Sequence, residues 1–322
     1  MTNETTTEFA GLTEPYRREL LVHCYRMLGS VHDAEDLVQD TLLRAWRAYD
    51  SYDESRASLR TWLYRIATNA CLTALAGRAR RPLPSGLGAP TYSPEDPFAP
   101  GFEVPWLQPI PDGLLGPPPG VGNEPASVRG LRLAIVAALQ LLPARQRAVL
   151  ILRDVLEWPA TEVAAMLDLT PAAVNSALQR ARARIREVGP REDDICEPVA
   201  ARAMVDRYVA AFENADLTAL KRLLTDDVVM EMPPYLNWFV GPEDYTRFIA
   251  RAFALRGTDW RCVPVGANGQ PAVAAYVRPP GGVHTLHTLQ IFTVRPGGVA
   301  HTIVYQDPVV FGLFDLPATI SP

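Results

Sequence analysis

The sequence predicts a multidomain protein in which two all-α modules are followed by an α+β module. Apolar residues recur at helical spacing over residues 13–81 and again from 129 to about 188, whereas alternating β-branched runs dominate after about residue 225. A proline- and glycine-rich stretch separates the two helical modules. With 322 residues, the chain is long enough for two or three domains that each bury a core.

Three helices are expected in the N-terminal module, residues 9–81. Serine, threonine and aspartate mark helix starts, and glycine marks a helix end. On these signals the first helix is capped by Thr13, has Pro15 in its opening turn and ends at Gly29. The second extends from Ser30 or Asp33 to about Ala48, and the third from Ser55 or Ser58 to about Gly77.

The connector, residues 82–128, holds 13 prolines and 7 glycines in 47 positions, so we expect no regular packed element in it. Its five acidic residues are not matched by any basic one. The segment 105–112, PWLQPIPD, places a tryptophan and two aliphatic residues among prolines. Such a segment is suited to docking, and Trp106 and Leu107 are therefore predicted to make a regulatory contact.

Residues 159–188 have the pattern of a helix-turn-helix. Thr170 followed by Pro171 is a strong signal for a helix start, and Val174, Leu178 and Ala181 then form one buried stripe. The opposite face combines small, polar and basic side chains, namely Ala172, Asn175, Ser176, Gln179, Arg180 and Arg184. Arginine and glutamine can read base edges in the major groove. An arginine-rich solvated helix is the alternative.

The distribution of charge along the chain supports DNA binding by this helix. The net charge of −5 disfavours nucleic acid as a partner of the whole chain. Residues 129–187, however, carry nine arginines against five acidic residues, whereas residues 188–322 carry 11 basic against 15 acidic residues. The sequence thus predicts a basic helical module and an acidic C-terminal module.

Two further helix faces in the N-terminal module are candidate binding surfaces. In the second helix, an acidic face also carries an exposed leucine, which suggests a dock for a basic partner or else a merely solvated face; its residues are Asp33, Glu35, Asp36, Gln39, Asp40 and Leu43. In the third helix, Trp62 lies beside Arg65 and Asn69. This combination suits stacking on an unpaired base, although Trp62 can equally pack against a neighbour.

Together these segments resemble a known family. Residues 31–48 (VHDAEDLVQDTLLRAWRA) and 58–70 (SLRTWLYRIATNA) resemble region 2 of the extracytoplasmic-function (ECF) sigma factors of bacterial RNA polymerase. Residues 139–187, from LLPARQRAVLILRDVLEW to the helix-turn-helix, resemble region 4 of the same family. The resemblance implies a factor that binds core RNA polymerase through its clamp helices and flap, melts promoter DNA and directs initiation.

The resemblance also assigns roles to the candidate residues. The acidic face of the second helix would bind the polymerase, and the exposed face of the last helix would read the −35 element. The −10 element would be captured as a single strand by Ser55, Arg56, Ser58, Trp62, Arg65 and Asn69. Many family members carry arginine at the positions of Asn175 and Ala177, so the −35 sequence itself does not transfer to this chain.

The C-terminal module, residues 198–322, is expected to be α+β. Helices are predicted at 198–213, 217–224 and 242–255, with strands at 228–232, 272–278, 287–294 and 299–305. Residues 200–316 resemble the SnoaL-like (NTF2-like) cone, and the WLQP segment resembles the linker of ECF sigma factors that carry this extension. Its polar cavity candidates are Tyr235, Trp238, His287 and Tyr305, with Glu231 and Asp307 as further polar residues.

The expected protein is therefore a non-enzymatic sigma factor with a fused regulatory domain. Region 2 (9–81) would be a bundle of three to four helices, and region 4 (129–188) a helix-turn-helix. The SnoaL-like domain would contact the sigma regions and would hold neither metal nor cofactor. Two alternatives are a DNA-binding regulator that acts without polymerase and a SnoaL-type cyclase or isomerase with a DNA-binding appendage.

The sequence also excludes several classes of protein. No run of 18 apolar residues is present, so no membrane-spanning helix is expected. The polar, acidic N-terminus lacks a secretion signal, and we expect a cytoplasmic protein. The four cysteines are far apart and form no CxxC pair, which argues against a disulfide framework or a zinc site.

Overall fold

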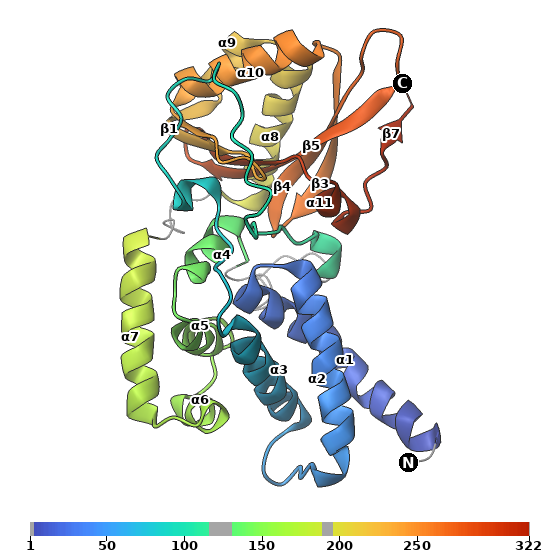
Figure 1. Cartoon of the computed structure of the whole chain (residues 1–322), viewed down its shortest axis with the longest axis vertical. Coiled ribbons are helices and arrows are strands. Elements are labelled where there is room, and N and C mark those ends of the chain that lie inside the picture. Colours follow the sequence, from blue (N-terminus) through green and yellow to red (C-terminus); the bar gives the residue numbers. More distant parts are fainter. Residues whose placement is uncertain (1–2, 116–130, 189–195, 322) are drawn as a thin grey trace. The chain divides into compact units, whose positions relative to one another are not determined.

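The computed structural model describes residues 3–115, 131–188 and 196–321, which divide into two compact units (Figure 1). The helical unit contains residues 3–81, 107–109, 113–115 and 131–188. The cone unit contains residues 82–106, 110–112 and 196–321. Helices thus precede an α+β unit, and the predicted fold class is confirmed.

The first half of the helical unit consists of three packed helices. They are α1 (Asn3–Leu28), α2 (Val31–Ala48) and α3 (Leu59–Leu75), and a 3-10 turn at Tyr49–Ser51 follows α2. Their shared core includes the fully buried side chains of Tyr25, Met27 and Leu63. The Ser30 hydroxyl caps α2 by accepting from the amide of Asp33 (3.2 Å), and Ser58 caps α3 in the same way through Thr61.

The start of α1 differs from the expectation. The helix begins at Asn3, and Pro15 lies inside it. Thr13 does not cap it, because its hydroxyl donates to the carbonyl of Phe9 (2.9 Å) one turn earlier. The Phe9 ring is buried and lies 5.2 Å from the ring of Trp46 and 5.0 Å from that of Tyr49. This tertiary contact holds the extra turns, which local capping signals cannot reveal.

The second half of the helical unit contains α4 (Leu133–Gln140), α5 (Ala144–Leu150), a π-helical turn (Ile151–Val155), α6 (Ala160–Leu167) and α7 (Pro171–Val188). The buried guanidinium of Arg147 connects it to the first half. It donates to the carbonyl of Met27 and to the side-chain oxygen of Gln140 (2.7 Å). Burial lowers the pKa of Arg147 to about 10, so the group remains charged at neutral pH.

The described part of the connector contains no α-helix or β-strand, in agreement with the prediction, but several of its apolar side chains are buried. Two short 3-10 turns occur at Pro84–Gly86 and Asp112–Leu114. Its buried apolar side chains are Leu83, Trp106, Leu107, Ile110 and Leu115. Proline restricts the backbone and so lowers the entropy cost of docking the apolar residues between prolines. Residues 116–128 lie outside the described ranges.

The cone unit is built on a strongly curved sheet with the strand order β2-β1-β6-β5-β4-β3. The strands are β1 (Leu224–Glu231), β2 (Trp238–Val240), β3 (Trp260–Ala267), β4 (Gln270–Val277), β5 (His284–Arg295) and β6 (Gly298–Tyr305), and β7 (Thr319–Ile320) pairs with β5. β1 and β6 are parallel, and the remaining pairs are antiparallel.

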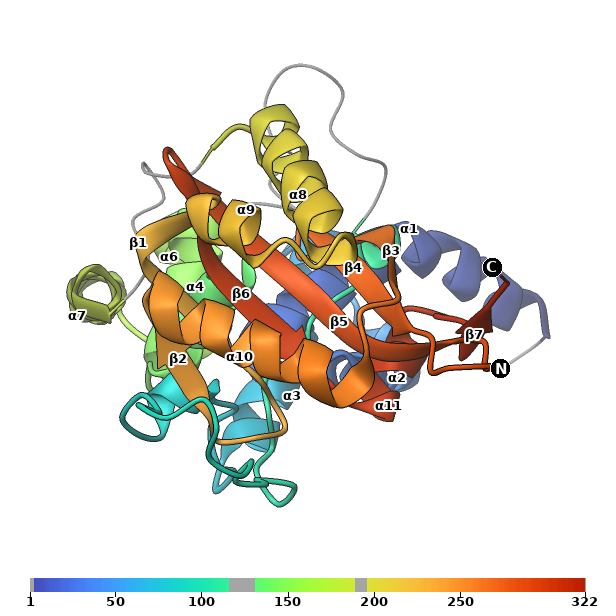
Figure 2. The ribbon, with the colours of Figure 1, turned by 90° about the horizontal axis from the view of Figure 1, so that it is seen from above.

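Helices cover one face of this sheet (Figure 2). They are α8 (Pro198–Glu213), α9 (Leu217–Arg222) and α10 (Pro242–Arg256), and α11 (Pro308–Leu313) follows the last long strand. Tyr208 and Phe212 of α8 meet Phe292 and Trp260 of the sheet in the core. The aromatic core therefore lies inside the cone, between the helices and the sheet.

None of the helices in the described ranges is both long and apolar enough to cross a lipid bilayer.

Candidate functional site

The exposed face of α7 presents the six residues predicted to read DNA. Val174, Leu178 and Ala181 bury the opposite side against the rest of the helical unit. The residues exposed on the outer face are Ala172, Asn175, Ser176, Gln179, Arg180 and Arg184. Thr170 caps the helix by accepting from the amide of Ala173 (3.2 Å). The face is thus polar and basic, and it is held by a buried stripe of the predicted spacing.

The turn before α7 is sharp because of one left-handed residue. Asp168 has a φ of 53° and ends α6, so that the chain can reverse direction in three residues. Aspartate tolerates this conformation better than most residues with a side chain. The turn gives the relation between α6 and α7 that is typical of a helix-turn-helix.

The acidic face of α2 is only partly free. Asp36 and Gln39 are exposed, and the Leu43 side chain is 47% exposed. Asp33, by contrast, forms ion pairs with Arg78 (3.2 Å) and Arg81 (2.8 Å), which hold the segment after α3 against the start of α2. Asp33 therefore has an internal role that its spacing did not reveal.

Two other acidic side chains complete this face. Asp40 pairs with Arg44 one turn later at 2.8 Å, and both side chains remain partly exposed. Glu35 is half-buried. The part that is open to a partner is therefore centred on Asp36, Gln39 and Leu43.

The −10 candidates lie on the loop before α3 and along that helix. Ser55, Arg56, Arg65 and Asn69 are exposed. Trp62 is half-buried, with its ring 5.0 Å from that of Tyr52. Of the two sequence interpretations, packing against a neighbour thus describes its state in this structure.

The other side of α3 packs against α6 and the turn before it. The ring of Tyr64 lies 5.0 Å from that of Trp158, and the Thr68 hydroxyl lies 3.9 Å from the Met166 sulfur. Arg65 forms an ion pair with Asp168 (3.7 Å) in the tight turn of the helix-turn-helix. Within the helical unit, one −10 candidate is therefore engaged by the turn next to the −35 candidates.

One buried residue near this contact was not singled out from the sequence. His23 is fully buried, and its Nε2 lies 2.9 Å from the Thr68 hydroxyl. Burial, together with the charge of Arg26, lowers the pKa of His23 to about 3, so the imidazole is neutral at neutral pH. A lone histidine in an apolar stripe carries no sequence signal that separates this role from others.

The two linker residues predicted to make regulatory contacts belong to different units. In the cone unit, the indole N–H of Trp106 donates to the carbonyl of Gly101 (2.8 Å). A Cβ at Gly101 would lie 2.9 Å from the Trp106 ring, so glycine is required there. In the helical unit, Leu107 is fully buried beside Gly29.

The neighbours of these residues are anchored as well. In the helical unit, the side-chain oxygen of Gln108 accepts from the Ser30 hydroxyl (2.9 Å) and the Val31 amide (3.0 Å). In the cone unit, the amide of Ile110 donates to the side chain of Asn268 (3.0 Å). The WLQPIPD segment is thus fixed in both units by specific hydrogen bonds.

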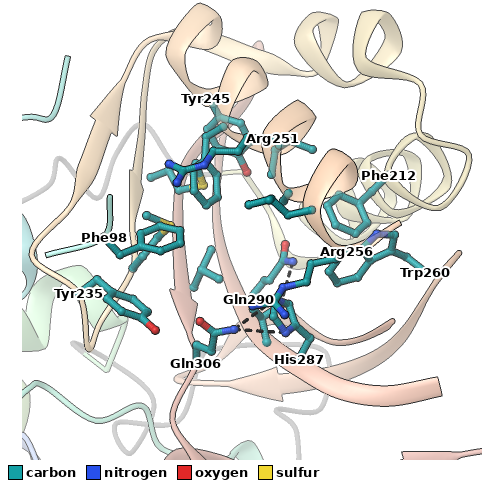
Figure 3. Close-up of a pocket in the computed structure, with 18 of the residues that line it drawn as sticks. Phe98, Phe212, Tyr235, Tyr245, Arg251, Arg256, Trp260, His287, Gln290 and Gln306 are labelled. Atoms are coloured by element: carbon teal, nitrogen blue, oxygen red, sulfur yellow. Dashed lines mark hydrogen bonds between the residues drawn. The ribbon is translucent and has the colours of Figure 1, made fainter. Parts of the chain in front are cut away.

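The cone unit contains a cavity of about 90 Å³ between α8, α10 and the sheet (Figure 3). Of the cavity candidates, Tyr235 and His287 line it. Trp238 and Tyr305 do not: the Trp238 indole donates to the carbonyl of Gly88 (3.1 Å), and Tyr305 is buried in the sheet. Strand alternation explains this result, because neighbouring positions face opposite sides of a sheet.

The polar end of the cavity is centred on His287. Its ring lies 5.4 Å from that of Trp260, and the Gln306 amide lies 3.2 Å from its nitrogens. Burial, and then the charge of Arg256, lowers the pKa of His287 to about 4, so it is neutral at neutral pH.

The described residues that line the cavity include no carboxylate to pair with His287. Glu231 instead bonds to His301 (2.9 Å), and Asp307 caps α11. In the described ranges, no three histidine, cysteine or acidic side chains are grouped as a metal site would require.

Comparisons with known proteins agree with these observations. Family models match Sigma-70 region 2 at residues 12–81, Sigma-70 region 4 at 132–185 and a SnoaL-like domain at 205–302. The chain is 46% identical to the ECF RNA polymerase sigma factor SigG of Mycobacterium tuberculosis, over 99% of this chain and 86% of the relative.

A second relative extends the comparison to a solved structure. The chain is 29% identical to the ECF sigma factor SigJ of Mycobacterium tuberculosis, over 73% of this chain and 70% of the relative. The crystal structure of that organism's SigJ matches with a TM-score of 0.66 at 22% identity, over 96% of this chain and 99% of that chain, which supports the fold. By its regions and by its identity to SigG, this chain belongs to the ECF sigma factors, which act with RNA polymerase in promoter-specific initiation of transcription.

Proposed function

We propose that this sigma factor reads its promoter with two surfaces of the helical unit. The exposed face of α7 would read the −35 element as duplex in the major groove, with Gln179 and Arg180 on base edges. Asn175, Ser176 and Ala172 would fit against the groove, and Arg184 would bind phosphate. The observation that carries the proposal is the continuous polar and basic face on a helix that a sharp turn and a cap hold in place.

The −10 element would be captured as a single strand by α3 and the loop before it. Ser55, Arg56 and Ser58 lie on the loop side, and Arg65 and Asn69 lie along the helix. Trp62 rests on Tyr52, and an aromatic pair of this kind provides a platform on which an unpaired base can stack.

Polymerase binding is assigned to the open part of α2. Asp36 and Gln39 would contact basic residues of the clamp helices, and Leu43 would add an apolar contact. Asp40 and Glu35 would lie at the edge of this polymerase-binding surface. Region 4 would in turn bind the flap.

We infer a regulatory, non-catalytic role for the cone unit. The absence of a carboxylate among the described cavity-lining residues argues against a cyclase or isomerase mechanism. The cone would contact the sigma regions through the WLQP segment, in which Trp106 belongs to the cone unit and Leu107 to the helical unit.

The test of this function is transcription from purified components. Core polymerase with the full chain should give promoter-specific transcripts, whereas a regulator that acts without polymerase would bind duplex DNA and give none. Trp62→Ala should leave −35 duplex binding unchanged and abolish open complexes, because duplex reading lies on α7 and stacking on α3. Unchanged permanganate reactivity of the melted −10 region in Trp62→Ala would contradict the stacking role.

A further inference from the structure

We propose that the cavity of the cone unit binds a small aromatic carboxylate, which enters in place of the linker residue Phe98. The proposal goes beyond promoter recognition, because it gives the sigma factor a ligand of defined chemical class. It rests on how the linker segment 93–98, here called the strap, is seated on α10.

The Phe98 ring forms part of the wall of the cavity, beside Tyr235 (Figure 3). It lies 4.8 Å from the Tyr235 ring and 5.9 Å from the Phe248 ring. The guanidinium carbon of Arg251 lies 5.2 Å from the centre of the Phe98 ring, on its face. The Phe98 residue is 37% exposed. One aromatic ring of the cavity wall is thus supplied by a linker rather than by the strands or helices of the cone unit.

The strap presents negative charge to α10 together with this ring. One nitrogen of Arg247 contacts both carboxylate oxygens of Glu95, at 2.7 and 2.8 Å. Arg251, one turn later, donates to the carbonyls of Pro94 and Asp96, at 2.6 Å each. An aromatic ring joined to oxygen acceptors is what an aromatic carboxylate also offers. The strap therefore occupies the site in the way that such a ligand would.

The volume of the cavity is too small for the Phe98 ring and the ligand to be bound at the same time. The cavity has about 90 Å³ with Phe98 in place. An engineered apolar cavity of about 150 Å³ is known to bind benzene, so a ligand of ring size needs the space of the Phe98 side chain as well. With that ring removed, Tyr235, Phe248 and Met232 would surround the incoming ring on apolar sides. A methionine sulfur and aromatic edges are favourable neighbours for such a ring.

The basic side chains that line the cavity favour an anionic ligand. Arg251 and Arg256 both line the cavity, and no carboxylate does so among the described residues. Within the described part of the chain, Arg256 has no hydrogen-bond or ion-pair partner. Gln290 and Gln306 at the far end add neutral amides that can donate to oxygen. Once the strap leaves, the donors of Arg251 become free for a carboxylate.

Binding of 2-naphthoate, a two-ring aromatic carboxylate, tests the proposal on the full chain by isothermal titration calorimetry. The wild type should bind it, and Phe98→Ala should bind it about tenfold more tightly, because the competing ring and its cation–π contact are gone. Tyr92→Ala is the matched control: Tyr92 is a linker aromatic that is 78% exposed and does not line the cavity, so affinity should not change.

Two further comparisons test the chemistry. The uncharged 2-naphthamide should bind at least tenfold more weakly than the carboxylate, and Arg251→Gln should remove that difference. Hydrogen exchange of residues 93–98 should become faster when 2-naphthoate is added, since the strap is released.

Three results would overturn the proposal. The first is that Phe98→Ala and Phe98→Leu both fold, as judged by circular dichroism and thermal melting against the wild type, but do not bind 2-naphthoate. Another is weaker binding by a folded Phe98→Ala than by the wild type, or slower exchange of the strap in the presence of the probe, because the ring would then be part of the site. The third is equal affinity for the carboxylate and the amide.

Discussion

At the scale of single residues, the neutral, fully buried His23 makes the helical unit sensitive to acid. Its pKa is lowered from 6.5 to about 3 on folding, so the unfolded chain takes up a proton at a higher pH than the folded chain does. The stabilisation from keeping His23 neutral is complete above pH 6.5. It is lost at about 1.4 kcal/mol per pH unit as the pH falls from 6.5 towards 3.

We therefore expect the free energy of unfolding to fall by roughly 2 kcal/mol between pH 7 and pH 5 from this group alone. Urea titrations followed by far-ultraviolet circular dichroism measure it. His23→Gln should reduce this pH dependence, and His32→Gln, at an exposed position of α2, should not. An equally steep pH dependence in His23→Gln and the wild type would contradict this origin.

Base reading is also a property of single side chains. Gln179→Ala and Arg180→Ala should each relax discrimination among −35 sequences, at a cost of about 1–3 kcal/mol for the preferred sequence, because each removes donors from the exposed face of α7. Fluorescence anisotropy with matched and mismatched −35 duplexes measures this.

Arg182→Ala supplies the control on the same helix. The Arg182 side chain forms a two-point ion pair with Asp154, at 2.6 and 2.8 Å, and is not part of the reading face. The Arg182→Ala variant should therefore show the wild-type ratio of affinities for matched and mismatched duplexes. A loss of discrimination in Arg182→Ala as large as that in Gln179→Ala would show that the effect is not base reading.

At the scale of elements, the open part of α2 should determine polymerase affinity. Asp36→Arg should weaken binding of core polymerase at least tenfold, because an acidic contact becomes repulsive towards a basic partner. Asp206→Arg makes the same charge change at an exposed position of α8 and should bind as the wild type does. Co-purification and titration with core polymerase compare the two variants, and equal affinities would exclude α2 as the dock.

Several elements could be predicted from sequence because their signals are local. Ser30, Ser58 and the Thr170–Pro171 pair mark three helix starts, and the stripe through Val174 and Leu178 fixes the buried side of α7. The fold class likewise follows from periodicity, and the family from the resemblance of the motifs to those of ECF sigma factors.

Other features depend on distant contacts and could not be predicted. The start of α1 depends on Phe9 reaching Trp46 and Tyr49. β3 contains Pro264 and Gly266, which weaken a strand pattern, yet it pairs along its length with β4. Asp33 has the spacing of an exposed acid, and only the later arginines Arg78 and Arg81 engage it.

At the scale of the whole molecule, the linker and the cone should tune promoter activity. Truncation after Val188 removes the part of the cone unit that follows the helical unit in sequence, including its whole sheet, and should change transcription from a target promoter several-fold. Trp106→Ala should change it in the same direction, because it removes the buried indole and its bond to Gly101. Tyr92→Ala, at a linker aromatic that is 78% exposed, is the control.

Run-off transcription with the purified full chain, the truncated chain and these variants gives the comparison. Equal activity of the full-length, truncated and Trp106→Ala proteins would leave the cone without a regulatory role. Opposite effects of truncation and of Trp106→Ala would separate the role of the cone from that of the WLQP segment.

The contact of α3 with the helix-turn-helix also has a thermodynamic consequence for the free protein. The Tyr64–Trp158 contact and the Arg65–Asp168 ion pair favour one arrangement of the helical unit, in which Arg65 is paired with Asp168. The apparent affinity for a single-stranded −10 element is the intrinsic affinity multiplied by the fraction of molecules in which this contact is broken. If about one molecule in a hundred is open, binding weakens about a hundredfold, and a polymerase that held the two regions apart would restore it. Free sigma factor would thus leave chromosomal single strands largely unoccupied until it joins the enzyme.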